Sequence, residues 1–445
     1  MALNKIPTNI TFTYEDNYFY YLKDNGDGME LFKNSFQGSE EVVVSLRTAG
    51  IEEGKLTLEE ELRRQRARQQ ATQGLTEYYT NKNTNKILLP VNGELFVHEN
   101  NKLFSISKNA LTPKFSNNGK YVGFVSENEL YYCDLNDTTH PVRLTFDATK
   151  NIVNGLAEYI AQEELDRSDG FWWSPDDKKI AFCQYDDSQV ADFILVHQSE
   201  EEFVTESHKY PFAGKKNVDV KLGVVNIVEN PPKIQWLTLP TTLPGSAAAV
   251  EFYICRVFWW KNGEVGAQIL SRDQRHSLVL RFDGNGNPSI VLYESSAYWI
   301  NLFEPENFYE LKNSPEFIFL SERDGFAHIY RFSSVDGKVI SQLTSGSWIV
   351  DSIVSVDEEN KTIYYIATAA HATELHFYST TWSDNPAQPP LSKQLSTVPG
   401  RHSIFINHQF TAYIDSFSSL TCPPSITLYS LVRFSLFCFL FIFQN

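Results

Sequence analysis

A unit of paired strands recurs along this chain of 445 residues. In each copy an apolar run is followed by a turn rich in Asn, Asp or Gly and then by a second apolar run. The pairs belong to units of roughly 40 to 50 residues with about four strands each, which is typical of the blades of a β-propeller. The clearest copies are Asn9–Asn34, Pro113–Asp137, Phe171–Asp187, Phe317–Gly346 and Asp351–Thr380.

Shorter signals support an all-β fold. The segments 117–119, 176–177 and 358–360 are polar turns between alternating runs, and they predict β-hairpins. Two units end in a similar phrase, Val-Arg-Leu-Thr at 142–145 and Ser-Gln-Leu-Thr at 341–344. Aromatic residues make up 14% of the chain, with 22 Tyr and 32 Phe against two Met, and this bias favours strands over helices.

The formal net charge of −17 limits the partners of this chain. Nucleic acid is excluded, because a strongly acidic protein offers no basic surface that could neutralise phosphates. The charge would attract positively charged ligands such as the free amino termini of peptides. Solubility alone is the alternative explanation of the same charge.

The cysteines indicate neither a metal site nor a disulfide framework, and we expect no cofactor. They are odd in number, widely spread and free of C-x-x-C pairs, so buried thiols in a reducing compartment are expected. The segments Asp24–Gly28 and Asp283–Asn287 resemble calcium loops but lack the required spacing and distal Glu, so we interpret them as hairpin turns. The cysteines are Cys133, Cys183, Cys255, Cys422 and Cys438.

The termini predict a cytoplasmic location. The first 22 residues lack the charged and apolar regions of a signal peptide. No segment reaches the roughly 20 apolar residues that cross a bilayer, the nearest being Phe434–Phe443. We therefore expect no contact with a membrane.

One segment, Leu56–Gly74, breaks the β pattern and predicts a helix. Thr57 and Glu60 have capping-box spacing, acidic residues occupy the first turn, and Gly74 would end the helix. Few of its residues are apolar, so this helix should project from a blade. Its arginines could form a solvated, self-paired charged face, with Glu59 paired to Arg63 and Glu60 to Arg64, or they could bind a ligand. The four arginines are Arg63, Arg64, Arg66 and Arg68.

Two adjacent carboxylates, Glu163 and Glu164, stand out on a short polar segment that is expected to be helical. An aromatic strand, Phe171–Trp173, a Ser-Pro-Asp-Asp turn and a second strand, Ile180–Tyr185, follow them. Adjacent acids often form a solvated helix end. A fixed pair, however, can hold an ammonium group with two charge-assisted hydrogen bonds. Trp172 and Trp173 are interpreted as blade core and loop support rather than as ligand stackers.

The string from Asn154 to Asp177, NGLAEYIAQEELDRSDGFWWSPDD, resembles the N-terminal β-propeller of the dipeptidyl peptidase IV family within the prolyl oligopeptidase superfamily. It is most similar to bacterial-type and cytosolic eukaryotic members. The resemblance extends from about Pro7 to Leu431 and implies a propeller of eight blades. It also implies that Glu163 and Glu164 bind the amino terminus of a peptide, and that Arg68 or Arg66 reaches a substrate carbonyl.

The same resemblance implies an activity and a partner. Family members are serine peptidases that release dipeptides from the amino terminus after Pro or Ala, and they commonly form homodimers. In this sequence the strings from Ser271, Ser321 and Thr344 also match the family and are assigned to blade architecture.

The sequence carries no visible nucleophile. It contains no G-x-S-x-G motif and no Ser-Asp-His order in an α/β pattern. We therefore expect a propeller, residues 1–431, truncated before the catalytic domain and inactive alone. The apolar run 432–445 is expected to be an aberrant tail with no blade to complete. The alternative is a non-catalytic propeller that serves as a protein-interaction module.

Overall fold

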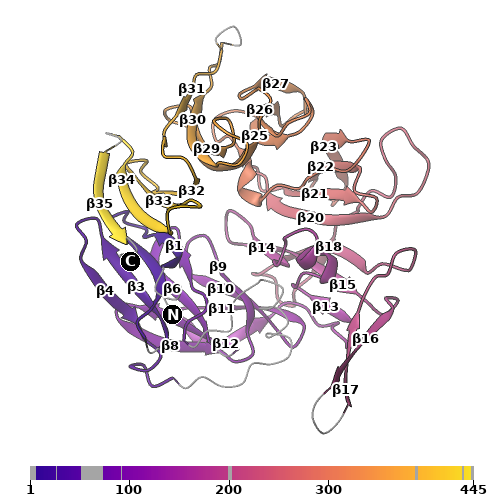
Figure 1. The fold of residues 1–445 in the computed structure, drawn as a ribbon. Coiled ribbons are helices and arrows are strands. Elements are labelled where there is room, and N and C mark those ends of the chain that lie inside the picture. The colour runs from indigo at the N-terminus through magenta and orange to yellow at the C-terminus, as the bar shows by residue number, and fades with distance from the viewer. Residues whose placement is uncertain are drawn as a thin grey trace.

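The computed structural model describes residues 7–26, 28–51, 74–91, 93–198, 203–385 and 389–432, together with the backbone of 435–441. Its strands form eight antiparallel sheets arranged in a ring (Figure 1). Seven of these sheets have four strands and one has five. The expected eight-bladed β-propeller is therefore confirmed, with blades that follow one another in chain order.

The first four blades contain the amino-terminal half of the ring. In the fourth blade, β13 and β14 both pair with β15, and the chain between them forms a short helix. The elements are β1 (Thr8–Phe12), β2 (Tyr18–Asp24), β3 (Met29–Ser35), β4 (Glu40–Val44), β5 (Tyr79–Asn81), β6 (Thr84–Val91), β7 (Glu94–Glu99), β8 (Lys102–Ser107), β9 (Leu111–Phe115), β10 (Tyr121–Ser126), β11 (Glu129–Asp134), β12 (Asp137–Arg143), β13 (Ile152–Asn154), α2 (Tyr159–Glu163), β14 (Phe171–Trp173), β15 (Lys179–Asp186), β18 (Asp219–Asn226) and β19 (Ile234–Trp236).

The last four blades repeat the same up-and-down order. A separate hairpin, β16 and β17, is inserted within the fourth blade. The remaining elements are β16 (Asp192–Gln198), β17 (Phe203–Lys209), β20 (Phe252–Trp259), β21 (Val265–Ser271), β22 (His276–Phe282), β23 (Pro288–Ser295), η2 (Pro305–Asn307), β24 (Phe308–Glu310), β25 (Glu316–Ser321), β26 (His328–Ser333), β27 (Val339–Gln342), β28 (Val350–Asp357), β29 (Thr362–Ala367), β30 (His376–Thr381), β31 (Ser392–Gln394), β32 (Arg401–Ile406), β33 (Ala412–Ser418), β34 (Ser425–Ser430) and β35 (Ser435–Phe441).

The hydrophobic core is divided among the interfaces between blades. Each interface between neighbouring blades contains its own cluster of buried apolar side chains. This arrangement follows from the sequence, because a blade in the ring buries both faces of its sheet and its central strands are apolar on both sides. All seven residues of β21, for example, are buried.

The ring closes between the first and the last blade without exchanging a strand. Ile10 and Phe12 of β1 belong to one buried cluster with Ile414 and Leu428 of the last blade. The Asp16 carboxylate also accepts hydrogen bonds from the backbone N–H groups of residues 408 and 409, at 3.1 and 2.7 Å. Side-chain packing and this buried carboxylate therefore hold the closure, where β1 lies next to the last blade (Figure 1).

The two similar segments of the sequence, 142–145 and 341–344, have the same structural role. The Thr145 hydroxyl accepts a hydrogen bond from the Leu130 N–H at 2.9 Å, and the Thr344 hydroxyl accepts one from the Ile329 N–H at 2.9 Å. In the seventh blade Ser396 accepts from the N–H of Phe377 at 2.9 Å. The hydroxyl that follows the outer strand thus caps the third strand in three blades.

The structure corrects the expectation for the carboxyl-terminal run. The backbone of Ser435–Phe441 forms β35, which pairs antiparallel with β34 and is the fourth strand of the last blade. The run was expected to have no blade to complete. An apolar segment of seven residues is long enough for an outer strand, and the last blade lacks one without it.

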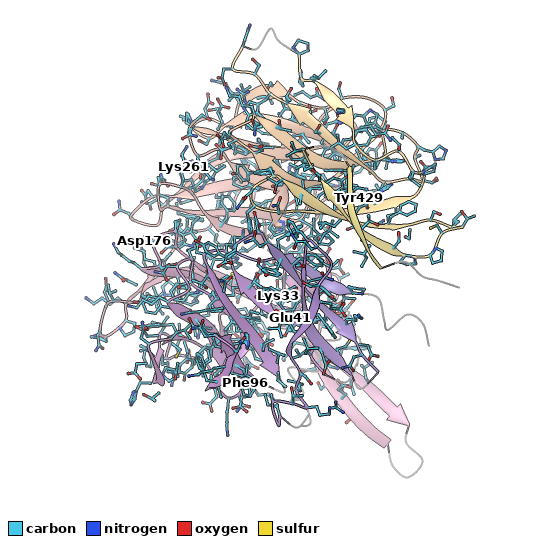
Figure 2. All side chains as sticks on the ribbon, turned by 90° about the vertical axis from the view of Figure 1, so that its left-hand side faces the viewer. Lys33, Glu41, Phe96, Asp176, Lys261 and Tyr429 are labelled. Carbon is cyan, nitrogen blue, oxygen red and sulfur yellow. The ribbon has the colours of Figure 1, made fainter. Side chains whose placement is uncertain are left out.

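The hairpin β16–β17 leaves the ring, as both views show (Figures 1 and 2). Four consecutive apolar residues of β16 are exposed: Phe193 to 41%, Ile194 to 60%, Leu195 to 38% and Val196 to 61%. Successive residues of a strand face opposite sides, so both faces of this hairpin are apolar.

The helix predicted over Leu56–Gly74 lies outside the described residues, except for Gly74. That glycine forms a backbone bridge with Met29 and has a φ of 95°. Among the residues that the structure does describe, no helix is long and apolar enough to cross a bilayer.

Candidate functional site

Helix α2, within the fourth blade, carries the two adjacent carboxylates. The helix begins at a buried glutamate, Glu158, whose carboxylate accepts hydrogen bonds from the N–H groups of Ile160 and Ala161 at 2.5 and 3.0 Å. The side-chain amide of Gln162 donates to the carbonyl of Ala157 at 2.6 Å. The first turn is thus fixed by side chains on both sides of its start.

The insertion that contains α2 is closed tightly at its base by two glycines. Gly155 has a φ of 79°, and a Cβ at Gly170 would lie 2.3 Å from the carbonyl oxygen of Gly155. The N–H of Gly155 donates to Cys183 at 2.8 Å, and the N–H of Cys183 donates to Gly170 at 2.8 Å. Only glycines allow the two ends of the insertion to pass so close to one another on β15.

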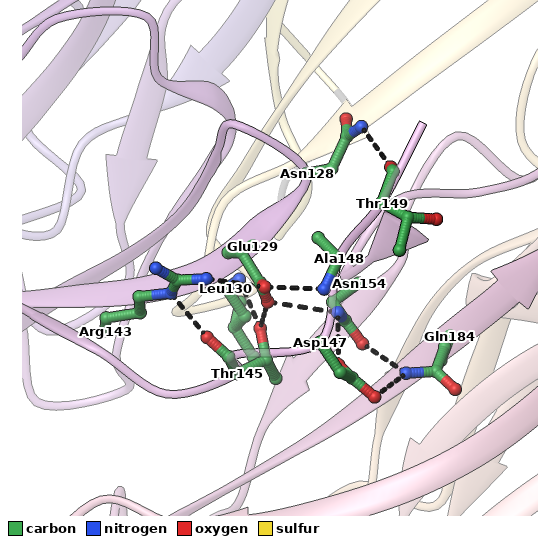
Figure 3. Close-up of polar contacts among 10 residues, drawn as sticks. All are labelled: Asn128, Glu129, Leu130, Arg143, Thr145, Asp147, Ala148, Thr149, Asn154 and Gln184. Carbon is green, nitrogen blue, oxygen red and sulfur yellow. Dashed lines mark hydrogen bonds and ion pairs between the residues drawn. The ribbon is translucent and has the colours of Figure 1, made fainter. Parts of the chain in front are cut away.

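A polar network holds the chain that enters this insertion (Figure 3). The buried Glu129 carboxylate accepts hydrogen bonds from Arg143 at 2.7 Å and from the Asn154 amide at 3.0 Å. Asn154 in turn accepts one from Gln184 at 3.0 Å, and both amides donate to Asp147. The network joins the third blade to the fourth immediately before Gly155.

Glu163 is the last residue of α2, and Glu164 is its C-cap; both are exposed. The Glu164 N–H donates to the Ile160 carbonyl at 2.9 Å, so the helical backbone includes it. A helix C-terminus is the unfavourable end for carboxylates, and this helix has no basic residue in its last turn. Two adjacent carboxylates at this end of the helix gain nothing from its dipole.

The residue after the pair anchors the turn in an apolar cluster. Leu165 is buried together with Tyr253, Cys255 and Leu270 of the fifth blade. Asp166 then adopts a φ of 48°, and the chain doubles back so that the N–H of residue 167 donates to residue 161 at 2.8 Å. The pair therefore lies on a braced turn rather than on a free loop.

Two buried arginines tie this turn to β20. Arg167 donates through Nε to the carbonyl of Ile254 at 3.1 Å, and Arg256 donates through Nη1 to the carbonyl of Leu165 at 2.5 Å. Arg256 also donates to the carbonyl of Phe303 at 3.2 and 3.0 Å. Burial lowers the pKa of the Arg256 guanidinium from its ordinary value, which reflects the loss of water around this charge.

A cavity of about 410 Å³ opens beside the turn, between the fourth, fifth and sixth blades. Arg167 and Arg256 belong to its wall, and its other sides are largely aromatic. Its volume lies within the range of small-ligand pockets, roughly 300 to 1,000 Å³. The aromatic lining residues are Trp172, Phe258, Phe303, Phe308 and Phe319.

The other residues singled out in the sequence have varied positions. Trp173 is buried and donates to the Lys114 carbonyl at 3.3 Å, in agreement with a role in the blade core. Trp172 packs on the interface with the fifth blade but also lines the cavity. Arg66 and Arg68 lie outside the described residues. Burial raises the pKa of Cys255 to about 12, so this thiol stays neutral.

Sequence reasoning missed the residues that brace the pair. Arg167 follows the pair within the quoted string, where only its proximity could have marked it. Arg256 lies in an apolar strand of another blade, and no local pattern connects it to Glu164. Within the described ranges, no group of three His, Cys, Asp or Glu side chains could hold a metal ion.

A sequence model for the dipeptidyl peptidase IV (DPP IV) N-terminal region matches residues 54–424. The chain belongs to this family. Among curated proteins, this dipeptidyl peptidase IV-type propeller is 28% identical over 288 residues to a probable dipeptidyl peptidase 4 of Aspergillus flavus, covering 61% of this chain and 36% of that protein. It is 29% identical over 273 residues to the inactive dipeptidyl peptidase 10 of Mus musculus, covering 59% of this chain and 33% of that protein.

Solved structures agree with the fold of this dipeptidyl peptidase IV-type propeller. The dipeptidyl peptidase 4 of Porphyromonas gingivalis superposes with a TM-score of 0.77 at 20% identity, over 98% of this chain and 59% of that one. A dipeptidyl aminopeptidase IV of Bacteroides ovatus, described as putative, gives 0.72 at 19% identity, over 99% and 61%. The present chain thus spans about a third of the curated relatives and about three fifths of these structures.

Proposed function

We propose that this propeller binds the free amino terminus of a peptide through Glu163 and Glu164, as the substrate-binding part of a serine-type dipeptidyl aminopeptidase. The observation that carries the proposal is the pair itself: two adjacent, exposed carboxylates on a braced helix end beside a cavity. An α-ammonium group has three N–H donors, and it can satisfy both carboxylates with charge-assisted hydrogen bonds.

The register of cleavage follows from such an anchor. If the amino terminus is held at Glu163 and Glu164, only a bond at a fixed distance along the peptide reaches a nucleophile, so residues leave two at a time. The 445 residues contain no G-x-S-x-G motif, so hydrolysis would need the serine of an α/β-hydrolase domain. Family membership supports cleavage after Pro or Ala, and the adjoining cavity would take a peptide side chain.

A titration tests the binding step. The purified chain is titrated by calorimetry with alanyl-prolinamide, which has a free amine, and with its Nα-acetyl form. We expect binding of the free amine alone, and an affinity loss of about 30-fold or more for Glu163→Gln or Glu164→Gln, since breaking such a pair costs about 2–5 kcal/mol. Glu359→Gln, an exposed carboxylate in a turn of the seventh blade, is the control. Equal binding of the acetylated peptide would refute the proposal.

The alternative function, a non-catalytic interaction module, has one observation in its favour. One relative at 29% identity carries the name inactive dipeptidyl peptidase 10. A module of this kind would bind a protein without any need for a free amino terminus. The acetylated peptide distinguishes the two functions, because only the peptidase subsite requires the ammonium group.

The projecting hairpin favours a homodimer, in which a second copy of this chain is the partner. Its four exposed apolar residues, Phe193–Val196, lie on both faces of a two-stranded sheet, where water would otherwise contact them. We expect a dimer in sedimentation velocity, and Ile194→Asp should dissociate it. Val335→Asp, at a valine in the turn after β26 that is 73% exposed, is the control. A monomer at every concentration would refute this assembly.

A further inference from the structure

Two arginines connect the turn that carries Glu163 and Glu164 to β20 in a reciprocal way. Arg167 donates through Nε to the carbonyl of Ile254 at 3.1 Å. Arg256, two residues beyond Ile254, donates back through Nη1 to the carbonyl of Leu165 at 2.5 Å, two residues before Arg167. Each side chain therefore spans the gap between the turn and the neighbouring blade, in opposite directions.

Both guanidinium groups are buried without a carboxylate in hydrogen-bond contact among the described residues. Arg167 is 5% exposed and Arg256 is 7% exposed. Arg167 also donates to the Asp169 carbonyl at 2.6 Å, while its Nη2 has no hydrogen-bond partner in the described structure. Arg331, also 5% exposed, has an ion pair with Glu316 at 2.7 Å. Burying a charge with carbonyl partners only is costly, so fold stability alone is a poor reason for it.

Arg256 also connects the turn to a second segment that lines the cavity. Its Nε and Nη2 both donate to the Phe303 carbonyl, at 3.2 and 3.0 Å, and the Phe303 side chain lines the cavity. One planar guanidinium group thus holds the residue next to Glu164 and the facing loop at the same time. Its rigid fork of donors suits this bridging, and a flexible ammonium group would not reproduce it.

We propose that Arg256 is a positioning residue of the amino-terminus site: it fixes the carbonyls of Leu165 and Phe303 and so sets the position of Glu164 relative to the cavity wall. This inference rests on the proposed function and deepens it. The role is geometric, because a cation in direct contact with the bound ammonium group would repel it. Arg167 holds the other end of the same turn.

The test compares Arg256→Met with Arg331→Met, which removes an equally buried arginine from the sixth blade. Both variants are titrated by calorimetry with alanyl-prolinamide. We expect Arg256→Met to bind about tenfold more weakly, equivalent to about 1.4 kcal/mol, and Arg331→Met to bind like the unmodified chain. Hydrogen exchange gives an independent measurement: the backbone N–H groups of Glu164 and Arg167 should exchange faster in Arg256→Met only.

A double-mutant cycle separates positioning from a general structural effect. If Arg256 acts through the carboxylates, Arg256→Met should cause no further loss in a Glu163→Gln, Glu164→Gln background. A further tenfold loss there would overturn the inference. Where Arg256→Met does not fold, Arg256→Lys replaces it, with an intermediate affinity expected because an ammonium group reaches fewer carbonyls.

The outcomes distinguish this inference from the proposed function. If the unmodified chain binds free and acetylated peptide alike, the proposed function fails, and hydrogen exchange still decides whether Arg256 holds the turn. If the unmodified chain prefers the free amine but Arg256→Met or Arg256→Lys binds equally well with unchanged exchange, the function stands and the positioning role is refuted.

Discussion

Glu129 and the pair Glu163–Glu164 place carboxylates in opposite surroundings. Glu129 is 1% exposed, and its two oxygens accept four hydrogen bonds, from Arg143, the Ala148 N–H, Thr145 and Asn154 (Figure 3). The pair is exposed at the end of a short helix. A carboxylate saturated with buried donors has no acceptor capacity left for a ligand, whereas an exposed carboxylate is accessible to one.

The two regions depend on each other. The Glu129 network holds Asn154, and the chain runs from there through the tight Gly155 passage into α2. The buried network thus fixes the start of the short segment that leads to the exposed pair. The buried network stabilises the chain next to the site and so offsets the energetic cost of placing two like charges together.

The largest effect should come from the exposed pair in a catalytic setting. In a chimera with the hydrolase domain of a relative, Glu163→Ala or Glu164→Ala should lower kcat/KM by roughly 30-fold or more, because losing one carboxylate costs about 2–5 kcal/mol. The melting temperature should not change. If both variants cleave like the parent chimera, the pair is a solvated helix end, and its exposure has no role in binding the peptide.

Glu129 should show the reverse behaviour. Glu129→Ala removes the acceptor of the buried Thr145 hydroxyl, of one N–H of the buried Asn154 amide and of the half-buried Ala148 N–H, so we expect a loss of about 3 kcal/mol in the free energy of unfolding. Urea titration measures it, with Glu359→Ala as the exposed control. Peptide affinity below the unfolding transition should fall less than in the Glu164 variants. A larger loss of affinity than of stability would show that the network belongs to the site itself.

A truncation of the last blade should change the stability of the protein without changing its affinity for the peptide. Since β35 pairs with β34 far from α2 in the chain, deleting residues 432–445 should lower the melting temperature by at least about 2 °C, equivalent to about 2 kcal/mol, and leave peptide affinity unchanged. Differential scanning fluorimetry checks this. An unchanged melting temperature would favour the aberrant tail that the sequence suggests.

The blades could be predicted from local pattern because each strand pairs with the next along the chain. The hairpins at 117–119, 176–177 and 358–360 all occur as expected, between β9 and β10, β14 and β15, and β28 and β29. The phrase at 393–396 was missed as a third copy because it ends in Ser rather than Thr, although its hydroxyl does the same work. The outer strand β35 was missed because a run of apolar residues carries no alternation.

The surroundings of the site could not be predicted in the same way. Glu163 and Glu164 were found because they are adjacent and followed by a strong aromatic motif. Arg256 is distant in the chain and reaches the turn only through the packing of neighbouring blades, and Glu129 contacts Asn154 in the chain that leads into the insertion. The partners of Arg256 are backbone carbonyls, which leave no pattern in the sequence. The partners of Glu129 are three side chains and one backbone N–H, at spacings that match no motif.

A third carboxylate, Asp415, should have the smallest effect on stability. It tests whether a carboxylate with a titratable donor makes the free energy of unfolding depend on pH. Asp415 is buried and pairs with His402 at 2.7 Å, so its donor can titrate near neutral pH, unlike the donors of Glu129. Burial opposes protonation of His402, but the Asp415 carboxylate outweighs it, and the pKa of His402 is raised. A raised pKa in the folded state means that the pair stabilises fully below the ordinary histidine pKa and that this contribution disappears as pH rises through the raised value. The free energy of unfolding from urea titration should therefore decline from mildly acidic to alkaline pH, and His402→Gln should flatten that decline. An equal slope in the variant would show that other groups determine the pH dependence.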